Sequence, residues 1–117
     1  MKKFLYFASG AIDSTTSTEE VACFPADKLS HMEMSNTGDL RLFFESNQEM
    51  NKDVDNAVVA LDITVGKHKE VMEAITGAIA SPTAINSPFI VVADSENSKF
   101  LHANITACAS IAVVEAA

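Results

Sequence analysis

Residues 29–45 read LSHMEMSNTGDLRLFFE, and this segment says more about the architecture than any other part of the chain. On both sides of Asn36–Asp39, every second residue is apolar. The alternating apolar positions are Met32, Met34, Leu40, Leu42 and Phe44. A period of two on both sides of a turn that contains Asn and Gly predicts a β-hairpin with one face on the core.

Outward from this hairpin, short apolar segments that are bounded by polar or proline-containing stretches predict further strands. These strands are expected at residues 3–8, 21–24, 57–65, 89–93, 99–105 and 110–115. The last two segments are alternatively one long bent strand that is interrupted near Thr106. In the segment 57–65, Val59, Leu61, Ile63 and Val65 share one face, so we expect that face to lie on the core.

The hydrophobic period changes to that of a helix over residues 67–80. The apolar positions there are Val71, Met72, Ile75, Ala78 and Ile79. They predict a single helix that ends before Pro82. Six or seven short strands with hairpin connections and one helix predict a mainly β or α+β chain with a mostly antiparallel sheet. We expect this small sheet to be strongly bent or closed into a barrel, with the helix across an open end or face.

The chain has 117 residues, eight basic and sixteen acidic side chains, and a formal charge of −8. This length predicts one domain, residues 1–117. The acidic balance argues against binding nucleic acid through a basic tail, but it leaves room for a local basic patch. No apolar run approaches the about 18 residues of a membrane span, so no membrane partner is expected. Cys23 and Cys108 lie in separate apolar strings, which favours reduced, half-buried thiols in a protein that is not secreted.

The densest positive charge lies at Lys67, His68 and Lys69, at the predicted start of the helix. Free backbone amides and two ammonium groups suit a phosphate, so these residues are candidates for an anion or nucleic-acid site. The alternative is that both lysines are solvated and balance neighbouring acids such as Glu70. A second basic spot, which includes Lys3, is expected to be terminal and flexible.

Single-stranded nucleic acid stacks on exposed aromatic rings that have basic neighbours. Phe43 leaves the apolar face of its strand and neighbours Arg41, so both residues join the candidate nucleic-acid site. Phe100 beside Lys99 is another candidate. The alternative for each ring is a place on a second apolar face of the sheet or in an interface.

Catalytic and metal chemistry are not predicted. The histidines His31, His68 and His102 form no HxH or HExxH spacing, and no phosphate-binding, dinucleotide-binding or nucleophile motif occurs. We therefore expect no enzymatic activity, no cofactor and no bound metal. Asp62 stands inside an apolar strand, where we expect it to point outward or to meet Arg41 across strands.

Apolar residues on both faces of several strands predict a surface for a partner. The residues expected opposite the main core face are Leu5, Phe7, Phe43, Val58 and Ala60. Residues 4–8 and 111–114 are expected to form edge strands that pair between subunits. A homo-oligomeric ring closed in this way would remove the exposed edges.

Four segments carry a resemblance to a known family: MKKFLYF at 1–7, PADKL at 25–29, GKHKEVMEAI at 66–75 and LHANIT at 101–106. The chain resembles small uncharacterised proteins from marine metagenomes that are of apparent cyanophage origin, and the resemblance covers most of its length. It implies an Sm-like fold, which is a small, strongly bent β-barrel, together with self-association into rings and a role in nucleic-acid processing. It also implies a location in the cytoplasm of an infected bacterial host or in the virion.

Two hypotheses about function follow from the residues and the resemblance. In the first, the chain is a self-associating small β-barrel protein of phage type that binds RNA or single-stranded DNA. The residues predicted to contact the nucleic acid are Lys67, His68, Lys69, Arg41 and Phe43. In the second, it is a virion structural or assembly protein without a nucleic-acid ligand. The acidic charge and the two-faced apolar strands fit this second hypothesis as well as the first.

Overall fold

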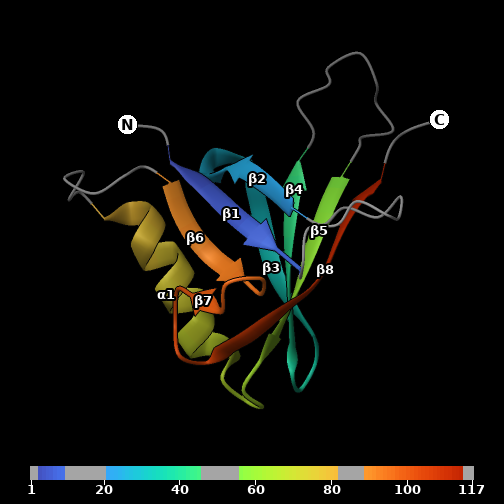
Figure 1. Ribbon diagram of the computed structural model, residues 1–117, viewed down its shortest axis with the longest axis vertical. Helices are drawn as coiled ribbons and strands as arrows, with labels where there is room; N and C mark the ends of the chain where they lie inside the picture. Colours follow the sequence, from blue (N-terminus) through green and yellow to red (C-terminus); the bar gives the residue numbers. More distant parts are fainter. Residues whose placement is uncertain (1–2, 10–20, 46–55, 82–88, 115–117) are drawn as a thin grey trace.

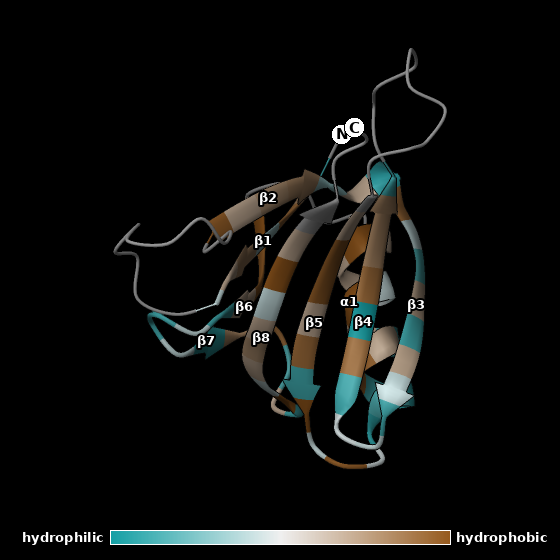
Figure 2. Ribbon diagram, turned by 90° about the vertical axis from the view of Figure 1, so that its right-hand side faces the viewer, coloured by the Kyte–Doolittle hydropathy of each residue, from teal (hydrophilic) through white to brown (hydrophobic). Residues whose placement is uncertain are grey.

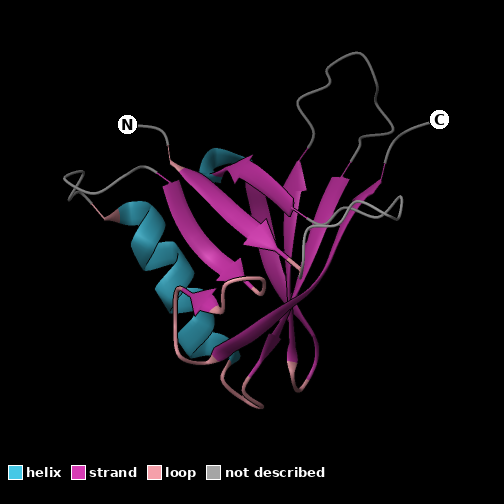
Figure 3. Cartoon of the chain, in the orientation of Figure 1, coloured by secondary structure: helices cyan, strands magenta, loops and turns pink. Residues whose placement is uncertain are grey.

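The computed structural model describes residues 3–9, 21–45, 56–81 and 89–114, which form two four-stranded sheets, one α-helix and one short 3₁₀ helix (Figure 1). The strands are β1 (Phe4–Ala8), β2 (Val21–Pro25), β3 (Leu29–Asn36), β4 (Asp39–Glu45), β5 (Asn56–Ile63), β6 (Phe89–Asp94), β7 (Lys99–Phe100) and β8 (Ile105–Val114). The helices are η1 (Ala26–Lys28) and α1 (His68–Ala80). Figure 3 shows how far strands predominate, which confirms the prediction of a mainly β chain with one α-helix.

Sheet B, with the strand order β3–β4–β5–β8, grows from the predicted hairpin. β3 pairs antiparallel with β4, β4 pairs antiparallel with β5, and β5 pairs antiparallel with β8. The backbone N–H of Gly38 donates a hydrogen bond of 2.9 Å to the side-chain oxygen of Asn36, which stabilises the turn between β3 and β4. Leu40, Leu42 and Phe44 are buried. The predicted hairpin and the face that it turns to the core are therefore confirmed.

Sheet A, with the order β2–β1–β6–β7, joins segments from the two halves of the chain. β1 pairs antiparallel with β2 and parallel with β6, and the short β7 pairs antiparallel with β6. The β1–β6 pair is the single parallel pairing among the described strands. Because β1 has a neighbour on each side, the prediction that residues 4–8 form an edge strand is wrong, whereas β8 does lie at the edge of sheet B.

The core lies between the inner faces of the two sheets, and α1 covers one side of it (Figures 1 and 2). Val71 and Ile75 of α1 are fully buried, as the helical period predicts. Three aromatic rings meet in the core, from Phe7, Phe24 and Phe44. The rings of Phe24 and Phe44 are stacked with their centroids 4.4 Å apart.

Several details of the predicted fold are corrected. The described strands form two open sheets and not a closed barrel. Leu5 and Phe7 are fully buried, so they belong to the core and not to the second face. The predicted strand over 99–105 is too long, because β7 ends at Phe100 and a turn follows. The alternative of one long strand holds only for Ile105–Val114, because β7 is a separate strand. The predicted strand over 57–65 is also too long, because β5 ends at Ile63 and Val65, expected on the core face, is 68% exposed.

Lys3 holds the end of α1 and is not the free terminal charge that the sequence predicts. Its Nζ donates hydrogen bonds of 2.8 Å to the carbonyl oxygen of Ala78 and 2.7 Å to that of Ser81. The last carbonyls of a helix have no partner within the helix and carry partial negative charge, so an ammonium group there is doubly favourable. α1 has no basic residue in its own last turn, and Lys3, the residue directly before β1, supplies the positive charge there.

Candidate functional site

His68, a predicted anion-binding residue, is engaged in a structural contact. Its Nε2 lies 2.9 Å from the carbonyl oxygen of Asn36 and 3.1 Å from that of Asp39. Both partners can only accept, so Nε2 carries the hydrogen and donates to them. His68 therefore fastens the start of α1 to the β3–β4 hairpin, and its Nε2 is not free for a phosphate.

We expect His68→Ala to lower the free energy of unfolding by about 1 kcal/mol, since it removes a part-buried hydrogen bond that links two elements. Urea unfolding followed by far-ultraviolet circular dichroism measures this change. Lys67→Ala, one residue earlier, is the matched control and should change stability by less than about 0.5 kcal/mol. Equal stability of the two variants would contradict the structural role of His68.

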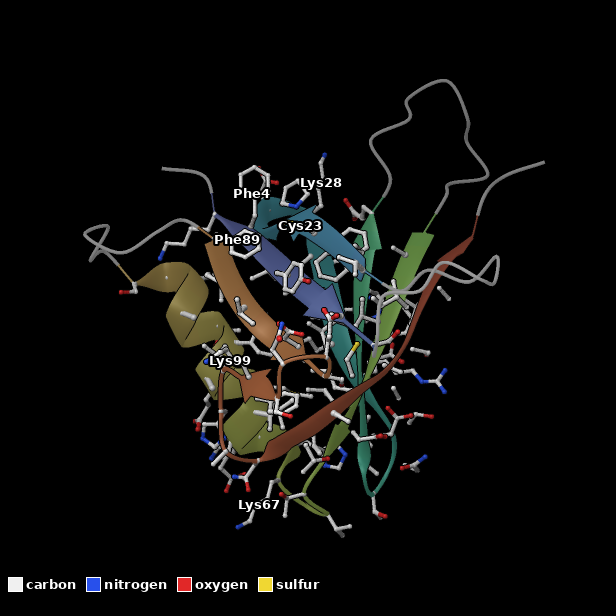
Figure 4. The ribbon with its side chains drawn as sticks, in the orientation of Figure 1. Phe4, Cys23, Lys28, Lys67, Phe89 and Lys99 are labelled. Carbon is white, nitrogen blue, oxygen red and sulfur yellow. The ribbon has the colours of Figure 1, made fainter. Side chains whose placement is uncertain are left out.

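Lys67 and Lys69 are both exposed at the start of α1. The Nζ of Lys67 lies 4.0 Å from a carboxylate oxygen of Glu70, in an exposed ion pair that contributes little to stability. Figure 4 shows Lys67 at the lower end of the molecule, away from the centre of both sheets. This arrangement matches the alternative interpretation of solvated lysines with an acidic neighbour more closely than that of a built anion site.

Arg41, another predicted contact, stands among acidic side chains on the outer face of sheet B. Its Nε lies 3.4 Å from Oδ2 of Asp39, and the register places Glu33 directly across from Arg41 on β3. Asp62 is exposed, so the expectation that it points outward is confirmed. It lies opposite Asp39 on β5, and Ala60 is the residue directly across from Arg41. The other carboxylate oxygen of Asp39 is buried, with no hydrogen-bond partner among the described residues. A phosphate approaching Arg41 would meet these acids.

Phe43 does leave the core face, as predicted, but its ring is already stacked. The rings of His31 and Phe43 lie with their centroids 4.5 Å apart and are nearly parallel, at 7°. Nε2 of His31 also lies 3.0 Å from a carboxylate oxygen of Glu33. Polar bands cross this outer face in Figure 2. The other predicted ring, that of Phe100, packs against the core.

The five predicted contacts therefore do not form one site. The structure does bring His68 and Arg41 together at Asp39, whose carbonyl oxygen accepts from His68 and whose carboxylate lies beside Arg41. Phe43 instead stacks on His31, and Lys67 pairs with Glu70. Among the described residues, no group of three or more His, Cys, Asp or Glu side chains is placed to hold a metal ion.

A second exposed surface has stronger features than the predicted one, and it lies on the outer face of sheet A. We call it the outer patch, and it consists of Phe4, Tyr6, Cys23, Phe89 and Val91. These residues alternate along their strands with buried or core-packed ones such as Leu5 and Phe7. Figure 4 shows Phe4, Cys23 and Phe89 together on the face of sheet A that is turned to the viewer. The four apolar residues of FLYF at 4–7 signal two apolar faces, but they do not say which face is outside.

The two cysteines are both free thiols in contrasting surroundings. Cys23 is exposed in the outer patch, while Cys108 is buried and its backbone N–H donates a hydrogen bond of 2.8 Å to Oγ of Ser95. Burial, with a smaller contribution from the negative charge of Asp62, raises the pKa of Cys108 to about 12. Partial burial also raises the pKa of Cys23. Neither thiol is activated as a nucleophile, because activation requires a lowered pKa.

Comparisons with protein-family models, with curated proteins and with solved structures gave no match to this chain. Among the described residues, no helix is both long and apolar enough to cross a membrane.

Proposed function

We propose that this chain is a self-associating β-rich module that acts by binding and not by catalysis. The observation that supports the proposal most directly is the outer patch, in which Cys23 and Phe89 are exposed while Phe4, Tyr6 and Val91 are half-buried. Phe89 alone is 46% exposed. Contiguous apolar surface of this kind marks interaction sites in soluble domains.

An Sm-like ring of phage type is the finer form of this proposal. β3 and β8 are the two edges of sheet B, and unpaired strand edges are natural sites for pairing with another copy. RNA or single-stranded DNA is the second candidate partner. It is supported by the exposed Lys67 and Lys69, which stand at the start of α1, where the helix dipole also favours anions.

Native mass spectrometry of protein purified without nuclease treatment tests these proposals together. We expect an oligomer of this chain at micromolar concentration, and a monomer throughout the concentration range would contradict self-association. Additional mass that nuclease removes would support nucleic-acid binding. In that case Lys67→Ala with Lys69→Ala should lose the additional mass, while the control Lys99→Ala retains it. An oligomer that carries no additional mass would instead support a structural or assembly role.

A further inference from the structure

The outer patch is continuous across three strands. The register places Phe4 beside Phe89 and Tyr6 beside both Cys23 and Val91. The rings of Tyr6 and Phe89 also touch diagonally across β1 and β6, with their centroids 5.2 Å apart. The patch is therefore one coherent surface and not a set of isolated apolar residues.

Charges flank the outer patch but do not enter it. Asp27 and Lys28 follow β2 at one end, and Glu96 and Lys99 belong to the β6–β7 turn and β7 at the other. Figure 4 shows Lys28 and Lys99 at these two ends of the face. Each end thus carries one acidic and one basic side chain.

The outer face of sheet B is more acidic. It exposes three acids and one base on strands β3 to β5, namely Glu33, Glu45, Asp62 and Arg41. The surface of α1 carries charges of both signs, because Lys67, Lys69, Glu70 and Glu73 are all exposed. Two copies of a chain with a formal charge of −8 repel each other least when they meet through the face that lacks charge at its centre.

We propose that two copies of the chain pack face to face through the outer patch, an inference that rests on the self-association proposed above. With the two β1 strands antiparallel across a two-fold axis, the Lys28 end of one copy lies over the Glu96 end of the other. The apolar centres meet, and each rim then holds two acidic and two basic side chains, so that opposite charges can pair across a self-complementary interface. Sheets pack in this way about 10 Å apart, with interdigitated side chains.

The placement of the basic side chains around the outer patch favours a second copy over a nucleic acid. A phosphate backbone needs a basic track beside the stacked rings. Lys28 and Lys99 stand at opposite ends, each near an acid, and do not form such a track.

Sedimentation equilibrium of three glutamate variants tests the proposal. Phe89→Glu places a charge in the patch and should raise the dimer dissociation constant at least about tenfold. Met34→Glu and Val65→Glu are matched controls, because these residues are also exposed large hydrophobics, at 59% and 68%, and lie outside sheet A. Both controls should leave the dissociation constant unchanged, and circular dichroism shows whether each variant is folded.

Alkylation of Cys23 in the wild-type chain gives a measurement that needs no variant. Its rate with iodoacetamide should fall several-fold as protein concentration rises through the dissociation constant, because the second copy covers the thiol. Two results would overturn this interface but leave self-association intact. In the first, the wild-type chain is an oligomer but its Cys23 stays equally reactive at all concentrations. In the second, Met34→Glu or Val65→Glu dissociates the oligomer and Phe89→Glu does not. A wild-type monomer would overturn both. Loss of bound nucleic acid from Phe89→Glu at an unchanged subunit count would assign the patch to nucleic acid instead.

Discussion

Replacing Phe44 with alanine is expected to lower the free energy of unfolding by about 3–5 kcal/mol, the largest effect of any single substitution considered for this chain. Phe44 is almost fully buried, and its ring contacts those of Phe24 and Phe7, with centroids 4.4 and 5.9 Å away. These rings come from β4 in sheet B and from β2 and β1 in sheet A, so the cavity would open where the two sheets meet.

Urea unfolding followed by far-ultraviolet circular dichroism measures this effect, since the chain contains no tryptophan. The matched control is Phe43→Ala, in which the same side chain is removed from the next position on the outer face. Phe43→Ala should lower the free energy of unfolding by about 1 kcal/mol, mainly because the ring no longer stacks on His31. Domains are typically stable by about 5–15 kcal/mol, so Phe44→Ala should be marginally folded. A loss no greater than that of Phe43→Ala would show that the aromatic cluster does not join the sheets.

The second large effect is a difference in reactivity between the two thiols. In dilute protein at pH 8, we expect iodoacetamide to modify Cys23 and to leave Cys108 unmodified. A thiol whose pKa is about 12 has roughly a thousandfold less thiolate at this pH than an ordinary thiol, and burial also blocks the reagent. Intact-mass measurement should show one adduct on the native chain and two in denaturant.

Cys23→Ser is the control, and its native form should take up no adduct. Rapid modification of Cys108 in the native chain would mean that the region around β8 opens readily.

The raised pKa of Cys108 also affects how stability depends on pH. Because the thiol of Cys108 stays protonated in the folded chain after the unfolded chain begins to lose its proton, the folded chain binds more protons above about pH 9. The free energy of unfolding should therefore fall as the pH rises from there toward 12.

Local patterns predicted the elements well, because hydrophobic period is a local property. The period of two in 29–45 identified β3 and β4, and the apolar stripe of 67–80 identified α1 within one residue of its start. The order of strands could not be predicted in the same way. The parallel pairing of β1 with β6 joins residues about 85 positions apart, and nothing in either segment specifies the partner.

The candidate site was predicted less well, because side-chain roles depended on backbone groups that carry no sequence signal. His68 binds two carbonyl oxygens of the hairpin, and Lys3 binds two carbonyl oxygens at the end of α1. From their charge alone, the sequence predicts that His68 binds an anion and that Lys3 is a flexible terminal residue. Their partners are peptide groups, which every residue has, so only the fold could reveal them.

The strand orders also bear on how the protein is made. As synthesis proceeds from the N-terminus, β1 and β2 emerge early, but β6, the second neighbour of β1, follows most of the chain. Likewise β3, β4 and β5 can pair as they emerge, but the second edge of β5 stays unpaired until β8, the last strand described, has been synthesised. Both half-built sheets would thus hold open edges on the ribosome until β6 and β8 emerge. Such edges are where nascent β-proteins mispair, so the interval before these two strands emerge is when this chain depends most on rapid strand pairing.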